Sequence, residues 1–389
     1  MLLSGLKVIE LASVLAGPSV GQFLSELGAE VIKIENPKTR GDVTRSWRLK
    51  SESDQNLSAY FSCANWGKKS LALDISHEKG HEIIMYLLQK ADIVLTSYKP
   101  GSAEKLGLDY EAIRKINDNI IYGSITSFGR GNDKAGYDAI IQAEAGFMSM
   151  NGQPGGASLK MPVALMDVLA AHHLKESILL ALLEKQRSGR GAYIEVSLIQ
   201  AAISSLANQA TNWLVAGEVP QKKGSAHPNI APYGDVFKTK DQKEIILAVG
   251  NNSQFKALCD LIGLHHLTSE ERFLHNQNRV GHRELLNGFL QDKISEWSRD
   301  DLLDALNKQK IPAGAIRQVD EVFESPEALE VILKNESYSG IKQFISKGLL
   351  QASDICPPPG LGQHTYEILQ SIGVSSEEYE HYKNLGLIV

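Results

Sequence analysis

A single carboxylate, Asp167, lies inside an apolar stretch of the sequence, MPVALMDVLAA. Apolar residues then recur at helical spacing up to residue 183, so the acid falls near the start of a long amphipathic helix that Gly189 would end. One interpretation is that Asp167 is the N-cap and accepts the free amides of the first turn. The other is chemical, because a carboxylate in apolar surroundings must be paired or reactive, and nearby helix amides would stabilise an oxyanion. Asp167 is therefore the candidate nucleophile.

Other residue patterns that could do chemistry are weaker. Residues 77–81 (HEKGH) match the zinc-peptidase motif H-E-x-x-H, but they directly follow a predicted strand, and Gly80 weakens the helix that the motif needs. The adjacent histidine pairs at 172–173 and 265–266 would diverge on a helix, so we expect no metal site. The sequence has no P-loop and no G-x-S-x-G elbow, which disfavours P-loop nucleotide chemistry and α/β-hydrolases.

Strands and helices alternate through the first part of the chain. Strands are predicted at 7–11, 30–35, 70–75, 92–98 and 120–127, with helices at 19–27, 78–89 and 110–116. This alternation predicts a parallel sheet with right-handed crossovers. We expect residues 16–18 (Ala-Gly-Pro) to break the chain before the first helix. The turn after the first strand lacks G-x-G-x-x-G, so the expectation is a Rossmann-like sheet without a dinucleotide.

The length of the chain predicts a second domain, since 389 residues exceed one ordinary domain. Residues 217–235 are rich in glycine and proline and are predicted to be a linker. A smaller α+β domain is expected at 236–330, with a hairpin around Asp241 and Gln242 and three helices. A proline-rich segment and a terminal helix from residue 363 follow.

Charge and cysteine content restrict the partners and the compartment. A net charge of −6 disfavours nucleic acid, because phosphate backbones select basic surfaces. Lys7 and Glu10 interrupt the N-terminal apolar stretch, and no apolar run reaches the roughly 20 residues that span a bilayer. Cys63, Cys259 and Cys356 show neither disulfide nor metal spacing. We expect a cytoplasmic protein with no membrane and no nucleic-acid partner.

Short motifs spread along the whole chain occur together in one known family. They are residues 5–18 (GLKVIELASVLAGP), 28–35 (GAEVIKIE), 41–45 (GDVTR), 65–75 (NWGKKSLALDI), 91–107 (ADIVLTSYKPGSAEKLG), 136–138 (GYD), Asp167, 189–191 (GRG), 227–233 (HPNIAPY), 250–259, 312–314 (PAG) and 361–364 (LGQH). Taken in order they resemble the class III CoA-transferases, the CaiB–BaiF family. The resemblance implies that residues 331–389 rejoin residues 1–216 in one large domain, and that two chains interlock as a homodimer.

The resemblance also implies roles for individual residues. The family's nucleophilic aspartate falls on Asp167, which implies a covalent route through an aspartyl–acyl anhydride and an aspartyl-CoA thioester. No permanently bound cofactor is implied, because CoA and acyl-CoA are substrates. The CoA contacts carried over are Leu15, Asn36, Leu73, Asp74, Ser76, Ser97, Tyr98, Lys99, Lys105 and Tyr137. The two lysines would bind phosphates, and Tyr137 would lie beside the thioester. Leu15 stands where formyl-CoA transferase has a glutamine, which disfavours oxalate–formate exchange.

The implied activity is transfer of CoA from an acyl-CoA to a small carboxylic acid. The segments GSAHPNIAPY and GNNSQF are more similar to the succinyl-CoA:dicarboxylate members, so a dicarboxylic acid is an expected acceptor. An α-methylacyl-CoA racemase is the alternative within the same fold, but the catalytic histidine of those enzymes would stand where this chain has Tyr137. A non-catalytic CoA-binding homologue is a third hypothesis, and it would be expected to lack Asp167.

Overall fold

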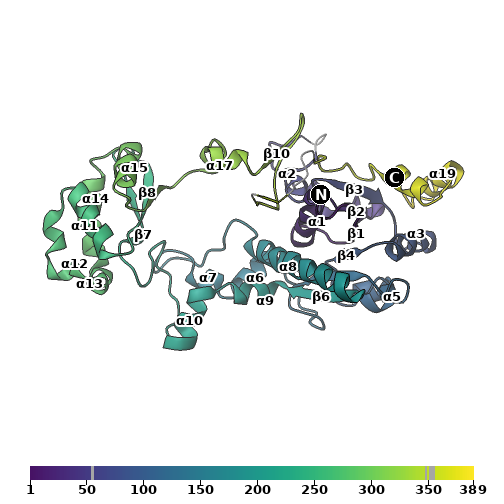
Figure 1. The fold of residues 1–389 in the computed structure, drawn as a ribbon, viewed down its shortest axis with the longest axis horizontal. Helices are drawn as coiled ribbons and strands as arrows, with labels where there is room; N and C mark the ends of the chain where they lie inside the picture. Colours follow the sequence, from purple (N-terminus) through teal and green to yellow (C-terminus); the bar gives the residue numbers. More distant parts are fainter. Residues whose placement is uncertain (54–56, 347, 350–354) are drawn as a thin grey trace. The chain divides into compact units, whose positions relative to one another are not determined.

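A six-stranded parallel sheet organises the larger part of the protein (Figure 1). The structure is a computed structural model that describes residues 1–53, 57–346, 348–349 and 355–389. The sheet has the strand order β3-β2-β1-β4-β5-β6 and consists of β1 (Lys7–Glu10), β2 (Glu30–Glu35), β3 (Lys68–Ala72), β4 (Ile93–Thr96), β5 (Ile121–Thr126) and β6 (Ala192–Ser197). The chain starts in the middle of the sheet and adds strands first to one edge and then to the other. The predicted α/β class with a parallel sheet is confirmed.

Helices cover both faces of this sheet, because successive strand residues point to opposite sides. Val8 and Val31 face one layer, whereas Ile9 and Ile32 face the other. The first layer contains α1 (Ala16–Glu26), α6 (Asp138–Glu144), α8 (Leu165–Ser188) and α9 (Leu198–Ser204). The second contains α3 (Glu78–Gln89), α5 (Tyr110–Arg114), α18 (Thr365–Ser371) and α19 (Ser376–Asn384). Burial of both faces explains why β4 (IVLT) is apolar at nearly every position, whereas β1, β2 and β3 also carry the buried charges Glu10, Lys33 and Lys68.

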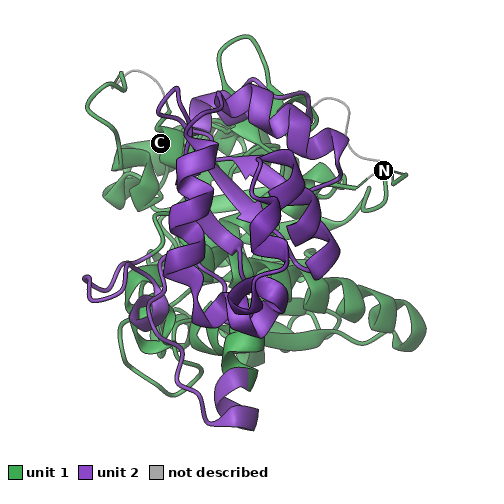
Figure 2. Cartoon of the chain, turned by 90° about the vertical axis from the view of Figure 1, so that its left-hand side faces the viewer, with its two compact units in different colours: residues 1–147, 161–211, 329–389 green, residues 148–160, 212–328 purple. Residues whose placement is uncertain are grey.

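The described chain divides into two compact units, coloured in Figure 2. Unit 1 consists of Met1–Phe147, Met161–Thr211 and Leu329–Val389, and unit 2 consists of Met148–Lys160 and Asn212–Ala328. The sequence-based division at 216 and 331 lies close to these bounds but differs in one segment. Residues 148–160, which we expected in the large domain, belong to unit 2.

Shorter elements complete the chain between these helices. In unit 1 they are α2 (Ala59–Ser62), α4 (Ser102–Lys105), the 3₁₀ turns Pro37–Thr39 and Val43–Ser46, and the hairpin of β10 (Ile332–Lys334) and β11 (Ser339–Ile341). Three helices cross a unit boundary: α7 (Phe147–Met150), α10 (Ala207–Ala216) and α17 (Pro326–Leu329). No helix in the described part of the chain is both long enough and apolar enough to cross a membrane.

Unit 2 is built on an antiparallel sheet of order β7-β8-β9, with β7 (Tyr233–Lys238), β8 (Glu244–Ala248) and β9 (Ala313–Ala315). The predicted hairpin is confirmed, and Gln242 in its turn has φ +59°. Its helices are α11 (Asn252–Leu261), α12 (Glu271–Leu274), α13 (Asn276–Gly281), α14 (Arg283–Ile294), α15 (Arg299–Lys308) and α16 (Val319–Phe323), with a 3₁₀ turn at His265–Thr268. The expected smaller α+β unit is therefore present.

Two expected helix boundaries are wrong. Residues 16–18 do not break the chain, because α1 begins at Ala16 and carries Pro18 in its first turn. Proline fits there since first-turn residues need no intrahelical amide bond. The single terminal helix expected from residue 363 is two helices, α18 and α19, separated by a turn in which Gly373 has φ +92°. By contrast, α8 ends as predicted at Gly189, which has φ +70°.

Candidate active site

Three loops that follow strands of the parallel sheet line a cavity of about 310 Å³ in unit 1. The lining residues are 13–17, which follow β1, 97–100, which follow β4, and 125–127 with 132–137, at and after the end of β5. The carboxyl ends of parallel strands meet at one edge of the sheet, where open α/β folds hold their ligands. Asp167, in the first turn of α8, lines the same cavity. The cavity thus combines the candidate nucleophile with the loops of a ligand-binding edge.

The carboxylate of Asp167 has no partner within the part of the chain that the structure describes. Asp167 is the third residue of α8, whose N-cap is Ala164, so the N-cap interpretation is wrong. It makes no hydrogen bond or ion pair with any described residue. Burial, followed by the negative charge of Asp138, raises the pKa of Asp167 to about 7. An unpaired carboxylate with a raised pKa is a better nucleophile than an ordinary aspartate and suits covalent catalysis.

A second aspartate, Asp138, takes over the capping of α8. Its Oδ2 accepts the backbone amide of Met166 at 2.7 Å, and its Oδ1 accepts a hydrogen bond from Gln142 Nε2 at 2.5 Å. Gln142 in turn accepts the amide of Met161 through Oε1 at 2.7 Å. Asp138 and Gln142 are both buried. They therefore fix the start of the helix from outside and leave the carboxylate of Asp167 free to face the cavity.

Five of the ten predicted CoA contacts line the cavity with Asp167. They are Leu15, Ser97, Tyr98, Lys99 and Tyr137. Tyr137 is 68% exposed, and its backbone is the N-cap position of α6. Ser97 is already engaged, because its Oγ accepts the amide of Ser13 at 3.0 Å. The structure thus brings together residues from three separate motifs of the sequence.

The other five predicted contacts do not line this cavity. They are Asn36, Leu73, Asp74, Ser76 and Lys105. The side chain of Leu73 is fully buried, so only its backbone could meet a ligand. Asp74 pairs with Lys38 at 2.6 Å and accepts hydrogen bonds from Ser76, and Asn36 accepts the amide of Lys38 at 2.9 Å. Lys105 is exposed at the end of α4.

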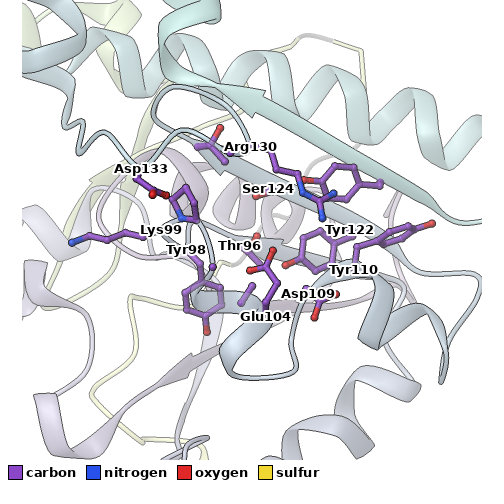
Figure 3. Close-up of a pocket in the computed structure, with 16 residues that line it drawn as sticks. Thr96, Tyr98, Lys99, Glu104, Asp109, Tyr110, Tyr122, Ser124, Arg130 and Asp133 are labelled. Carbon is purple, nitrogen blue, oxygen red and sulfur yellow. The ribbon is translucent and has the colours of Figure 1, made fainter.

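A second cavity of about 480 Å³ lies beside the first (Figure 3). Tyr98, Lys99 and Asp133 line both. Tyrosines line much of the rest of this second cavity. Among them are Tyr110 and Tyr122, whose rings meet edge to face with centroids 6.0 Å apart. The side chain of Lys99 points away from these tyrosines in Figure 3. Lys99 therefore lies at the border between the two cavities, with its charge directed out of the tyrosine-lined one.

Sequence reasoning missed two residues that interact electrostatically with Asp167, namely Asp138 and Tyr60. Asp138 belongs to the motif Gly136-Tyr137-Asp138, for which the family resemblance implies a role of Tyr137 but none of the acid. Tyr60 belongs to none of the sequence motifs described above, so nothing in the sequence indicated that it lies near Asp167. Burial, followed by the charge of Asp167, raises the pKa of Tyr60 to about 12, and its ring meets Trp47 edge to face at 5.0 Å. Both residues reach the site through tertiary packing.

Within the ranges that the structure covers, no group of three or more His, Cys, Asp or Glu side chains could hold a metal ion. In the H-E-x-x-H sequence, His77 is the N-cap of α3, and its Nδ1 accepts the amide of Lys79 at 3.1 Å.

Known proteins match the chain over nearly its whole length. A succinate–glutarate CoA-transferase of Agrobacterium fabrum is 38% identical over 384 residues, 95% of each chain. The human succinyl-CoA:glutarate CoA-transferase is 34% identical over 95% of this chain and 86% of its own. A crystal structure of a CAIB/BAIF family protein from Brucella suis superposes with a TM-score of 0.85 and 38% identity, covering 95% of this chain and 99% of that one.

The family assignment rests on the match as a whole. Residues 3–365 match the family described as CoA-transferase family III. This span contains the parallel sheet, the cavity and Asp167. The chain therefore belongs to CoA-transferase family III and is a CoA-transferase that uses CoA thioesters as substrates.

Proposed function

We propose that this enzyme exchanges CoA between two small dicarboxylic acids, with succinyl-CoA as a donor and a glutarate-sized acid as the acceptor. The choice of substrate rests on the relatives, two of which are named for succinate or succinyl-CoA and for glutarate. The observation that carries the mechanism is the carboxylate of Asp167, which has no partner among the described residues and lies in a cavity at the carboxyl edge of the sheet.

The proposed reaction proceeds by four transfers at Asp167. Its carboxylate attacks the thioester carbonyl, so that an aspartyl–acyl anhydride forms and CoA leaves as the thiolate. The thiolate attacks the aspartyl carbonyl, which gives an aspartyl-CoA thioester and releases the first acid. The acceptor carboxylate then attacks this thioester and expels CoA thiolate. Finally the thiolate attacks the acyl carbonyl of the new anhydride, which frees Asp167 and the new acyl-CoA.

We expect Lys99 to meet a CoA phosphate at the rim of the cavity. It is exposed and lines both cavities, whereas Lys105 lines neither. Lys99→Ala should raise KM for acyl-CoA more than KM for the acceptor acid, and the effect should shrink at high salt because screening weakens the wild-type contact. Lys105→Ala is the matched comparison for a lysine outside the cavity lining. Equal KM values for wild type and Lys99→Ala would exclude this role.

Racemisation is the weaker alternative for this site. It needs a second proton-transfer group opposite the aspartate, and family members of that kind use histidine there. Among the described residues that line the cavity there is no histidine, and the resemblance of the Gly-Tyr-Asp motif implies that Tyr137 stands where those enzymes have theirs. Proton exchange at the α-carbon of a 2-methylacyl-CoA, followed in heavy water, would reveal such an activity.

A heavy-oxygen experiment tests the covalent route directly. In the proposed sequence, each released acid carries away one Asp167 oxygen, and each acceptor leaves one of its own oxygens on Asp167. Turnover with a heavy-oxygen-labelled acceptor should therefore place label in the Asp167 peptide, as read by mass spectrometry. Asp167→Ala should lose transfer by at least about 10³-fold, in line with removal of a covalent nucleophile. Unlabelled Asp167 after many turnovers would exclude the anhydride route.

A further inference from the structure

The loop after β1 contains a residue in a rare backbone conformation. Val14 has φ +73°, which lies in the left-handed region. A β-branched residue seldom adopts this region, because its side chain clashes with the backbone there and strains the chain. Val14 and its neighbours Ser13 and Leu15 line the cavity that contains Asp167. Such a conformation persists only where other contacts hold it.

A buried carboxylate holds the amide of Val14. The backbone N–H of Val14 donates to Asp42 at 3.2 Å from Oδ2 and 3.4 Å from Oδ1. The side chain of Asp42 is 1% exposed and pairs with Lys33 Nζ at 2.9 Å. Thr44 adds hydrogen bonds from its amide at 3.0 Å and its hydroxyl at 2.8 Å. Burial opposes ionisation, but Lys33 and Thr44 together lower the pKa of Asp42, so the acceptor stays charged.

Lys33 fixes the same loop at a second point. Its Nζ donates to the carbonyl of Ala12 at 2.8 Å and to Glu10 Oε1 at 3.0 Å. The amide of Ser13 is held separately by Ser97. Three successive residues of the loop are thus tied to β2, to the segment after it and to the loop after β4. The loop has little freedom to relax the strain at Val14.

We propose that Asp42 and Lys33 are positioning residues for CoA transfer, which hold residues 13–15 in the strained turn that shapes the cavity wall. The inference rests on the proposed function of Asp167. Neither side chain lines the cavity, so both act through the backbone of the loop. A wall displaced by about 1 Å would misplace the thioester relative to Asp167, and such errors reduce rates by about 10²-fold.

A double substitution separates positioning from general stability. Asp42→Asn removes the charge that Lys33 pairs with and loosens Val14, so kcat/KM for acyl-CoA should fall about 10- to 100-fold. Adding Val14→Gly should restore most of that loss, because glycine adopts positive φ without the side-chain penalty. The glycine also relieves the strain and so stabilises the folded state, which means that stability alone would rise in the double variant. The comparison is therefore made per folded molecule, well below the unfolding transition of each variant, where a variant that was merely destabilised shows no loss of kcat/KM to rescue.

A milder variant and a matched control complete the test. Thr44→Val removes the hydroxyl that donates to Asp42 but keeps the size and shape of the side chain. It should lower kcat/KM for acyl-CoA less than Asp42→Asn does, and Val14→Gly should again restore most of the lost kcat/KM. Asp235 is a buried aspartate of unit 2 that pairs with Arg283 at 2.6 Å, and Asp235→Asn should leave kcat/KM unchanged in the folded fraction.

Crystal structures of Asp42→Asn and Thr44→Val provide a readout that is independent of the chemistry. Residue 14 should leave the left-handed region in the former and return to it in the double variant with Val14→Gly. A φ that stays positive together with unchanged turnover, or a loss that the glycine does not rescue, would overturn the proposal. An unlabelled Asp167 in the heavy-oxygen experiment would instead reject the proposed function and leave the crystallographic result intact.

Discussion

At the scale of single residues, Asp167 and Asp138 divide two tasks that one aspartate often performs alone. Asp138 binds the amide of Met166 and so caps α8, whereas Asp167 keeps a carboxylate without a partner in the described chain. Their proximity also has an electrostatic effect, because two like charges disfavour simultaneous ionisation. The capping acid therefore helps to raise the pKa of the reacting one.

The first prediction concerns the pH dependence of Asp167. Attack requires the carboxylate, so the rate of covalent capture should rise with pH and level off above an apparent pKa near 7 in the free enzyme. Asp138→Asn removes the like charge and should move this profile to lower pH. Single-turnover mass spectrometry of the Asp167 adduct measures both. Asp109→Asn, a change at the N-cap acid of α5, is the control and should leave the profile in place.

The second prediction follows from the same pKa by linkage. The folded state keeps the Asp167 proton up to about pH 7, whereas the unfolded chain releases it near about pH 4. Stability should therefore fall as pH rises between these values. Asp167→Asn should remove that slope and stabilise the protein at alkaline pH by on the order of 2 kcal/mol, allowing for the partial exposure of the side chain. Parallel urea titrations at several pH values measure the difference, and identical slopes would contradict the raised pKa.

At the scale of elements, α1 packs closely on the strand that carries the buried charges. A Cβ atom at Gly21 would collide with Glu10 Oε2, which pairs with Lys68 Nζ at 2.7 Å. Lys68 also donates to the carbonyl of Pro18 at 2.8 Å, so the ion pair ties the first turn of α1 to β1. Glycine is therefore required where the helix crosses the buried pair.

The third prediction uses two helical glycines with opposite surroundings. Gly21→Ala should destabilise the protein by about 3 kcal/mol or more, because the methyl group displaces a buried ion pair. Gly288, in α14, has no described atom within 4 Å of its missing Cβ and no positive φ, so Gly288→Ala should stabilise the protein by about 0.5–1 kcal/mol. Chemical denaturation measures the change in the free energy of unfolding for each variant, which should be a decrease for Gly21→Ala and an increase for Gly288→Ala. If Gly21→Ala left the free energy of unfolding unchanged, α1 could move away from Glu10 without destabilising the protein, which would contradict the prediction.

Some of the helices and strands could be predicted from the sequence alone, and others could not. Alternating apolar periodicities predicted the parallel sheet and the start and end of α8, because burial on both faces leaves a local signature. Residues 198–216 form two helices, α9 and α10, which are separated around Ser205 and Leu206, and Ala207 has φ +47°. The apolar pattern continues through this break, so periodicity does not reveal it.

In the candidate site, too, one part could be predicted from the sequence and another could not. Asp167 could be predicted because its apolar neighbours are adjacent in the sequence. The cap by Asp138 could not, because it joins residues that are 28 positions apart, and only the fold brings them together. The contacts that hold the loop around Val14 likewise come from Lys33 and Asp42, which are distant from that loop in the sequence. Local pattern identifies the reacting group, whereas tertiary contacts decide how it is held.

At the scale of the whole molecule, unit 1 exposes apolar side chains on neighbouring helices. Leu180 and Leu183 of α8 are 66% and 53% exposed, and Ile203 of α9 is 51% exposed. Packed helices α8 and α9 are consecutive in the first layer. Leu180 and Leu183 lie three residues apart and so share one face of α8, and clusters of exposed apolar side chains mark interaction surfaces. We propose that a second copy of the chain covers them.

The fourth prediction is an interlocked homodimer. Interlocking would bury much more than an ordinary interface of about 1,600 Å², so folding and association should form one concentration-dependent transition. Analytical ultracentrifugation across a dilution series, with unfolding followed in parallel, measures both. Leu183→Glu should weaken the dimer, and Leu285→Glu, at an exposed leucine of α14 in unit 2, is the comparison at a position outside this surface. A folded monomer at micromolar concentration would contradict the interlocked arrangement.

The return of residues 329–389 to unit 1 has a consequence for protein synthesis. Leu387 and Ile388 are 1% exposed and belong to the same apolar layer as α3, and the carbonyl of Leu387 accepts the amide of Asp74 at 2.9 Å. Unit 2 is encoded between the parts of unit 1, so on the ribosome its core is complete while one layer of the parallel sheet still lacks α18 and α19. Nascent chains should therefore bury unit 2 first and keep the sheet open to chaperones and proteases. The active enzyme can form only after translation has passed this segment.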